Sequence, residues 1–215
     1  MQQNKYISNP SSFIKIASKL TLKLGEIHEV CGPSRIRFPI IVGSETDGLI
    51  VWIRHNWSNT FLNPDGLWHW ISPERILFIN ASNTNDLLSC MEEVLRSGIA
   101  PLVIAELAAI PKTTPMRRLN LAMRAGQEFN KNLTPISIIL TPNNGGATNI
   151  GSRWHISSLP CWKKEKNSSY AFTHGKWCLE RLFSKTAPQK KWVLEACEVD
   201  SDKPSPKLVL KPFYK

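Results

Sequence analysis

The sequence lacks several features that would assign it to a class at once. None of its apolar runs approaches the roughly 20 residues that a membrane-spanning helix needs, and its polar N-terminus has no hydrophobic segment of the secretory type. Its five cysteines form no C-x-x-C pair, and their odd number argues against a zinc site or a disulfide framework. We therefore expect a soluble, cytoplasmic protein that keeps its thiols reduced and uses no metal or other cofactor.

Acidic residues are also scarce, since 17 Asp and Glu stand against 27 Lys and Arg, which leaves a net charge of +10. Residues 1–150 carry 14 basic and 11 acidic side chains, whereas residues 151–215 carry 13 and 6, so +7 of the excess lies in the last third. Such basicity favours nucleic acid, an anionic membrane surface or an acidic protein as a partner. The alternative is a solvated surface that only keeps the protein soluble.

Apolar runs of strand length alternate with helical patterns through most of the chain. One helix is predicted between a cap at Asn83 or Asn85 and a stop at Gly98, and another is predicted to begin at Thr114-Pro115. This alternation favours a parallel sheet covered by helices on both faces. The predicted strands of that sheet are residues 26–31, 49–54, 76–80, 102–105 and 136–141.

The two ends of the chain depart from this pattern. Residues 153–158, 176–183 and 192–199 are predicted strands without helices between them, which suggests an antiparallel extension of the sheet. Residues 1–24 are predicted as an N-terminal amphipathic helix, because apolar residues recur at helical spacing between Phe13 and Leu20. The predicted domains are thus this helix, a core over residues 25–200, and a basic, proline-rich tail over residues 201–215.

The tail alternates lysines with apolar side chains that can anchor it on a partner. A segment of this kind adds a strand to another sheet or docks in a groove, and this is the interpretation that we favour. The alternatives are contact with nucleic acid and an edge strand of the chain's own sheet. The anchor candidates are Leu208, Leu210, Phe213 and Tyr214.

Residues 25–33 resemble the first strand of a RecA-like core. In that family the strand leads into G-x-x-x-x-G-K-[ST], whose backbone N–H groups wrap the phosphates of a nucleotide. Here the chain continues without a second Gly and without Lys-Ser/Thr, and Pro33 and Pro39 lack the N–H group that such a loop uses. The resemblance therefore implies a degenerate nucleotide loop, which consists of Gly32, Pro33, Ser34 and Arg35.

The middle of the chain resembles RecA-like proteins more closely. L-N-P at residues 62–64, R-S-G at 96–98 and the strand at 102–106 follow one another like that family's L-D-P, R-S-G and Walker B strand. The family's magnesium-associated Asp falls at Glu106, for which we prefer the alternative of a strand-end carboxylate that pairs with Arg or caps a helix. The carboxylate that activates water should follow the second strand, yet residues 52–56 contain no acid. We expect no ATPase activity.

Three segments are similar to the ImuA group rather than to RecA itself. R-R-L-N-L-A at residues 117–122 with A-G at 125–126 is similar to that group's R-R-L-Q-L-A…A-G helix. Residues 147–156 are similar to its A-A-x-T-R-W-x-V strand, and W-V-L-E at 192–195 fits its closing strand. The resemblance implies an α/β fold with a RecA-like, mostly parallel sheet that is flanked by helices and carries a C-terminal antiparallel strand extension.

ImuA-type proteins act in DNA-damage-induced (SOS) mutagenesis, so the resemblance implies a non-catalytic role in DNA repair by translesion synthesis. The expected partners are a Y-family-like polymerase and the alpha subunit of an error-prone replicative-type DNA polymerase, with RecA and single-stranded DNA as further candidates. A protein that bridges DNA and polymerases can also associate with the nucleoid. Two alternatives stay open: a divergent RecA-like protein that binds DNA with ATP through Arg35 or Arg37, and a RecA-like regulatory module that contacts only proteins.

Two groups of residues are candidates for contact with DNA. In RecA-like proteins a flexible DNA-contacting loop follows a central strand, and exposed N–H groups in such a loop can meet phosphates. The resemblance places this loop at Asn143, Asn144, Gly145 and Gly146, with Arg153 soon after. The alternative for this loop is a surface turn. The second group lies on the helix that begins at residue 114 and comprises Arg117, Arg118 and Arg124. The alternative for this group is a solvated helix face.

Overall fold

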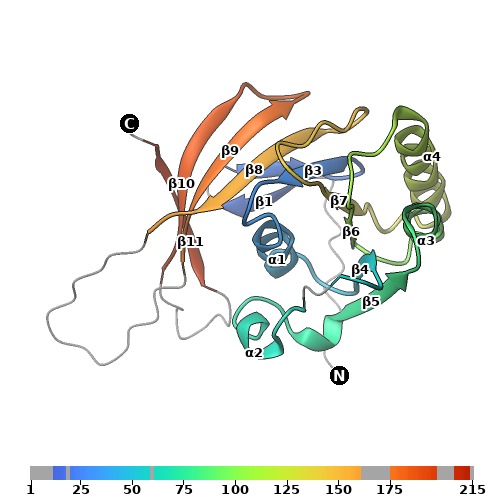
Figure 1. The fold of residues 1–215 in the computed structure, drawn as a ribbon, viewed down its shortest axis with the longest axis horizontal. Helices are drawn as coiled ribbons and strands as arrows, with labels where there is room; N and C mark the ends of the chain where they lie inside the picture. The colour runs from blue at the N-terminus through green and yellow to red at the C-terminus, as the bar shows by residue number, and fades with distance from the viewer. Residues whose placement is uncertain (1–11, 18–19, 59–60, 161–174, 198–205, 214–215) are drawn as a thin grey trace, which may run out of the picture.

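The computed structural model describes residues 12–17, 20–58, 61–160, 175–197 and 206–213 (Figure 1). Within them the chain forms a nine-stranded sheet in the order β11-β10-β9-β8-β3-β7-β6-β4-β5 and a separate two-stranded sheet, β1-β2. The strands of the large sheet are β3 (Ile27–Cys31), β4 (Ile50–His55), β5 (Ile76–Ala81), β6 (Leu102–Glu106), β7 (Ile136–Leu140), β8 (Ser152–Ser158), β9 (Lys176–Ser184), β10 (Lys190–Cys197) and β11 (Lys207–Pro212).

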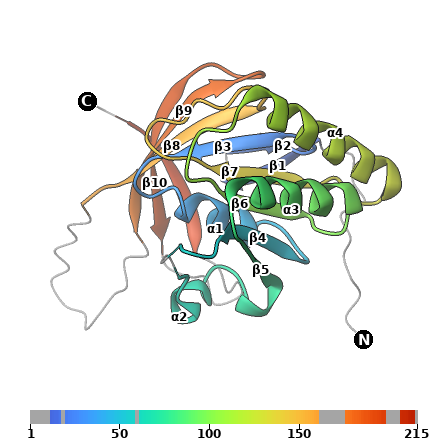
Figure 2. The same ribbon diagram turned by 45° about the vertical axis from the view of Figure 1, so that its right-hand side comes forward.

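The part of the sheet from β8 to β5 is parallel, because each neighbouring pair in it runs in the same direction. Helices connect most of its strands, and a short helix and a 3-10 turn precede β5. The prediction of an α/β fold with a sheet flanked by helices is confirmed (Figures 1 and 2). The helical elements are α1 (Arg37–Ser44), α2 (Pro64–Leu67), the 3-10 turn (Pro73–Arg75), α3 (Thr84–Ser97) and α4 (Thr113–Phe129).

Two hydrophobic cores lie on opposite faces of the sheet. β4 shows the division, since Trp52 packs among residues of α1 and of the β1-β2 sheet, while Val51 and Ile53 pack among residues of α3 and α4. Side chains of a strand alternate between the two faces, so successive residues of one buried strand serve both cores. Figure 2 shows α3 and α4 next to each other, apart from α1. We call the two sides the α1 face and the α3 face.

Local signals in the sequence account for the helix boundaries. The Asn83 side chain accepts a 3.0 Å hydrogen bond from the Asp86 N–H, and Gly98 ends α3 in a left-handed conformation with φ 60°. Helix α4 begins at Thr113 and has Pro115 in its first turn, where a missing N–H removes no hydrogen bond. The helices predicted from these signals are confirmed. None of the helices in the described ranges is long and apolar enough to cross a bilayer.

The C-terminal end of the sheet is antiparallel, as predicted. β9 pairs antiparallel with both β8 and β10, and β11 pairs antiparallel with β10. The described part of the predicted tail is thus an edge strand of the chain's own sheet rather than a free anchor. Leu208 and Leu210 pack against the core on the α1 face, and Lys191 Nζ lies 4.6 Å from the centroid of the Phe213 ring. Tyr214 lies outside the described residues.

The predicted N-terminal helix is wrong where the structure describes it. Phe13–Ala17 and Leu20–Lys23 form strands β1 and β2, which pair antiparallel; residues 1–11 lie outside the described part. The same segment also fits the two-residue period of a strand, and packing on the sheet decided between the two periods. The strand conformation buries three apolar side chains in the core on the α1 face: Ile16, Leu20 and Leu22.

Candidate functional site

The degenerate nucleotide loop lies where β3 ends and α1 begins, at the edge formed by the carboxyl ends of the parallel strands. The Ser34 N–H donates a 3.1 Å hydrogen bond to the Ile156 carbonyl of β8, and the Ser34 and Ser158 hydroxyl oxygens lie 2.8 Å apart. Gly32 has a φ of 95°, and a Cβ there would lie 2.5 Å from the Ile156 carbonyl oxygen. The close approach of β8 therefore explains this glycine. Pro33 is exposed, and the next amide is bound to protein rather than open to a phosphate.

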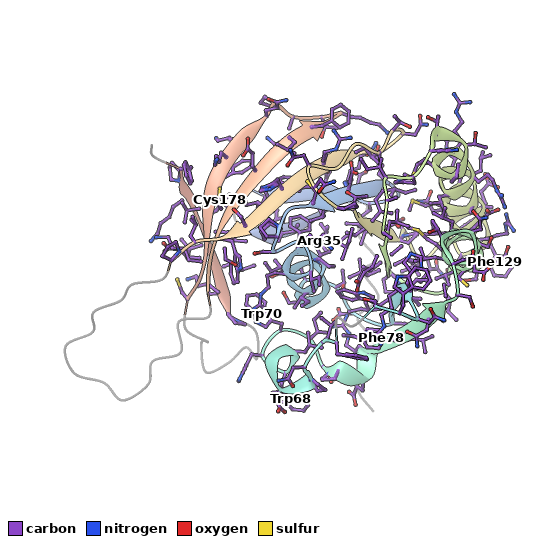
Figure 3. All side chains as sticks on the ribbon, in the orientation of Figure 1. Arg35, Trp68, Trp70, Phe78, Phe129 and Cys178 are labelled. Carbon is purple, nitrogen blue, oxygen red and sulfur yellow. The ribbon has the colours of Figure 1, made fainter. Side chains whose placement is uncertain are left out.

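Two arginines follow this loop, and their surroundings differ. The Arg37 guanidinium packs against two indoles, 5.0 Å from the Trp70 ring centroid and 5.1 Å from that of Trp177, and burial lowers the pKa of Arg37. Arg37 is thus a packing residue that joins α1 to β9, which makes it a poor substitute for a phosphate-binding lysine. Arg35 is half-buried at the carboxyl edge (Figure 3) and close enough to Glu106 to affect the pKa of that carboxyl.

Glu106 ends β6 at the same edge and is bound by an indole. The Trp52 Nε1–H donates to Glu106 Oε1 at 2.5 Å. Burial raises the pKa of Glu106 above its ordinary value, while this hydrogen bond and the charges of Arg54 and Arg35 act in the opposite direction. A carboxyl group that already accepts a hydrogen bond and has a raised pKa is a weak ligand for magnesium.

The strand that should lead to a water-activating carboxylate carries the opposite charge instead. Arg54 follows Trp52 on the α1 face of β4, and its Nε donates to Asn80 Oδ1 at 3.0 Å. Its guanidinium lies 4.8 Å from the Phe61 ring centroid and 4.9 Å from that of Phe78. A guanidinium stays protonated in proteins and cannot accept a proton from water. The sequence predicts that this acid is absent. It does not predict the cluster around Arg54, although the two-residue period of β4 places Trp52 and Arg54 on one face.

The glycine-rich loop between β7 and β8 folds inward around a buried carboxylate. Glu29, in the middle of β3, is fully buried. Its carboxylate accepts hydrogen bonds from the Thr141 hydroxyl at 2.8 Å and from the N–H groups of Gly146 at 2.8 Å and Ala147 at 3.1 Å. The expectation of an outward-pointing N–H group is wrong for Gly146, because its N–H satisfies this buried acid. The only signal for Glu29 in the sequence is an acid inside an apolar strand.

Arg153 completes this network instead of reaching into solvent. Its Nε donates to Glu29 Oε2 and its Nη2 donates to a loop carbonyl at 2.8 Å, which leaves its side chain 22% exposed. Gly145 has a φ of 70°, and a Cβ there would lie 2.8 Å from Glu29 Cδ. Among the loop candidates for DNA contact, the side chains that remain exposed are those of Asn143 and Asn144.

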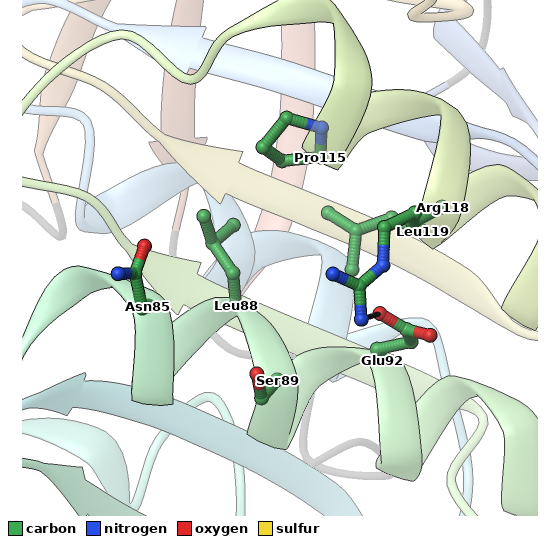
Figure 4. A pocket seen from close by; sticks show the side chains of 7 residues that line it. All are labelled: Asn85, Leu88, Ser89, Glu92, Pro115, Arg118 and Leu119. Carbon is green, nitrogen blue, oxygen red and sulfur yellow. Dashed lines mark ion pairs between the residues drawn. The ribbon is translucent and has the colours of Figure 1, made fainter.

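The three arginine candidates of α4 are exposed, and one of them is paired. Arg118 Nη2 lies 2.8 Å from Glu92 Oε2 on α3, and Glu92 also binds Arg96. Arg117 and Arg124 have no ion pair within the described residues. Arg118 and Glu92 line a small pocket between the two helices (Figure 4), together with Asn85, Leu88, Ser89, Pro115 and Leu119.

The loop between β7 and β8 contacts α4 at two places. The hydroxyl oxygens of Thr113 and Thr148 lie 3.1 Å apart, and Asn120 Nδ2 donates to the Asn149 carbonyl at 2.9 Å. These contacts join the helix to the end of the loop. We call this region the α4 surface, and its exposed members are Lys112, Arg117, Arg124, Asn143 and Asn144.

The reactive side chains near the carboxyl edge are buried. Cys31 Sγ donates to the Trp154 carbonyl at 3.3 Å, and burial raises the pKa of its thiol to about 11. His55 is buried and stacked on Trp57, with 4.1 Å between ring centroids, and burial lowers the pKa of His55. A protonated thiol and an imidazole covered by an indole are a poor nucleophile and base. Within the described ranges, no group of three or more His, Cys, Asp or Glu side chains could hold a metal ion.

No protein-family model matches the chain, and no curated protein matches its sequence.

Proposed function

We propose that this protein is a non-catalytic, RecA-like accessory protein of DNA-damage-induced (SOS) mutagenesis, which bridges DNA and error-prone polymerases during translesion synthesis. Its partners in this proposal are a Y-family-like polymerase and the alpha subunit of a replicative-type DNA polymerase. The observation that carries the non-catalytic part is the Arg54 guanidinium on the strand next to Glu106, where an ATPase of this type would need a carboxylate.

Phosphoryl transfer needs three parts, and the residues at the corresponding positions have other roles here. A phosphate cradle needs free amides, and the Ser34 N–H is bound to β8. A metal site needs an ionised carboxylate, but burial raises the pKa of Glu106, and the Trp52 indole N–H donates a hydrogen bond to one of its oxygens. An attacking water needs a base, and Arg54 cannot be one. These replacements favour a protein that binds and positions others over one that hydrolyses ATP.

The α4 surface is the part of the molecule that best fits contact with DNA. Arg117 and Arg124 expose guanidinium groups without an ion pair among the described residues, and the loop that carries the exposed Asn143 and Asn144 contacts the same helix through Asn149. Such groups bind phosphates without reading the bases. A weak contact of this kind is sufficient for an accessory protein, because polymerase contacts on the same chain raise the effective concentration at the lesion.

Binding of a labelled single-stranded oligonucleotide, measured by fluorescence anisotropy in a salt series with and without ATP, tests the proposal. We expect binding that weakens with salt and does not change with ATP. Replacing both arginines, Arg117→Ala and Arg124→Ala, should weaken binding and reduce the slope of log K against log salt by about 1.4, since each phosphate contact on a single strand contributes roughly 0.7. The matched control is Arg96→Ala on α3, whose guanidinium pairs with Glu92 and Glu93, and it should leave the slope unchanged.

The other outcomes select the alternatives. Binding that ATP stimulates would favour the divergent RecA-like DNA-binding protein, and absence of binding at every salt concentration would favour a regulatory module that contacts only proteins. In cells, deletion should abolish damage-induced mutagenesis, and unchanged mutagenesis in the deletion strain would reject the accessory role.

A further inference from the structure

The large sheet has two edges, and only one of them is protected against pairing. β11 forms one edge, and Lys207, Lys211 and Pro212 on it discourage the addition of another strand. β5 forms the other edge, has β4 as its only neighbour among the described strands, and reads I-L-F-I-N-A without charge or proline. Leu77 on it is 50% exposed and Phe78 37%, and Figure 3 labels Phe78. An apolar, uncharged edge of this kind is a template for pairing with another chain.

The hydrogen bonds of β5 show which of its backbone groups point outward. The Asn56 N–H donates to the Ala81 carbonyl at 2.9 Å, so the backbone groups of Ala81 face β4. Because the N–H and C=O groups of successive residues in a strand point to alternate sides, those of Leu77 and Ile79 also face β4. The residues whose N–H and C=O groups point to the open edge are therefore Ile76, Phe78 and Asn80.

We propose that a second copy of this chain pairs with β5, antiparallel and across a two-fold axis at Phe78. In this register Phe78 lies opposite Phe78 of the second copy, and Ile76 lies opposite Asn80. All three outward-facing residues then meet outward-facing residues and form about six N–H···O=C hydrogen bonds. A two-fold interface matches a surface to itself, and no other two-fold register pairs all three residues. The two sheets become one continuous sheet.

The side chains suit this occupant. Leu77 lies opposite Ile79 of the second copy on the α3 face, and the two Phe78 rings meet on the α1 face, so both faces gain apolar pairs. The paired strands themselves contain no charge, and the nearby Arg54 guanidinium is held by Asn80, Phe61 and Phe78 of its own copy. The pairing involves only the edge of the sheet and does not depend on the proposed function.

The net charge gives the pairing a characteristic salt dependence. Each copy carries +10, and this charge opposes the approach of a second copy at long range. Salt screens that repulsion and should strengthen the dimer. Binding to nucleic acid has the opposite sign, because salt weakens it.

Sedimentation velocity of the full chain between about 1 and 100 µM, a range that spans weak association, tests the proposal. We expect the mass to rise with concentration toward twice the 24.3 kDa of one chain, and to do so more readily at high salt. Leu77→Lys places a charge opposite Ile79 of the second copy and should keep the protein monomeric over the whole range. The matched control is Leu121→Lys on α4, which also changes an exposed leucine (63%) and should dimerise like the wild type. Circular dichroism of each variant shows whether it is folded.

A cysteine on the axis tests the register. Opposite residues of a hydrogen-bonded antiparallel pair have Cα atoms about 5.5 Å apart, a distance that a disulfide spans. Phe78→Cys should therefore form a disulfide-linked dimer under mild oxidation, whereas Asn80→Cys, which lies opposite Ile76, should not. A wild type that stays monomeric at every concentration and salt, or a Leu77→Lys variant that dimerises like the wild type, would overturn the proposal. Equal cross-linking of the two cysteine variants would overturn the register.

Discussion

Two acidic side chains of the parallel sheet, Glu29 and Glu106, have very different surroundings. Glu29 lies inside β3, is fully buried, and accepts hydrogen bonds from a hydroxyl, from two loop N–H groups and from Arg153. Glu106 lies at the end of β6 and accepts a hydrogen bond from the Trp52 indole, while burial raises its pKa. Burying a carboxylate is costly unless donors replace its water. The first acid has such donors and organises a loop, whereas the second is only partly compensated.

This difference explains why the loop after β7 is ordered around a buried group of the protein itself, the Glu29 carboxylate. The composition of the loop after β7 suggests a mobile segment open to phosphates, but two of its N–H groups point at Glu29 and Gly145 lies against the same carboxylate. The glycines therefore allow the loop to pack closely against the buried Glu29 carboxylate. Of the candidate cations for DNA contact, those on α4 lie outside this network.

Removal of the Glu29 carboxylate should have the largest effect on stability. Glu29→Ala leaves the Arg153 guanidinium and two inward N–H groups without their acceptor, and we expect it to lower the free energy of unfolding by about 3–5 kcal/mol. Urea denaturation measures this loss. Glu29→Gln is the matched control, because it keeps the volume and one acceptor oxygen, and it should lose less. A loss under about 1 kcal/mol for Glu29→Ala would show that the network does not hold the loop.

A methyl group at Gly145 should perturb the same network more mildly. Gly145→Ala combines a left-handed backbone with a Cβ 2.8 Å from Glu29 Cδ, and we expect a loss of about 2 kcal/mol in the same urea measurement. Gly66→Ala on α2 is the control, since a Cβ there meets nothing within 4 Å, and it should be neutral or slightly stabilising. Equal stability of the two variants would argue against tight packing of the loop on Glu29.

The pH dependence of Glu106 should give the smallest effect. Because its pKa is raised in the folded protein, its contribution to stability is fully present below its ordinary pKa of 4.5 and is lost as the pH rises through the folded value. Glu106→Gln cannot ionise and keeps an acceptor for Trp52, so it should gain stability relative to the wild type as the pH rises from 4 to 7. Urea denaturation at several pH values measures this difference. A constant difference over that range would show that the pKa of Glu106 is not raised in the folded protein.

The sequence by itself determined the order of most strands and helices. The cap at Asn83, the stop at Gly98 and the alternation of buried strands depend on residues a few positions apart, and the structure has them as predicted. The antiparallel run after β8 follows equally from strands that no helix separates. Local patterns of this kind carry their own physical cause, because turns, caps and periodicity act within one element.

The tertiary structure alone decided the strands at the two ends of the chain and the roles of the buried polar groups. The N-terminal segment fits both a helical and a two-residue period, and burial against the sheet selected the strand. The partners of Glu29 lie 112 to 124 residues away in the sequence, and the partner of Trp52 lies 54 residues away. A single sequence shows which side chains need a partner but not which distant groups supply it, because packing of the whole sheet creates those contacts.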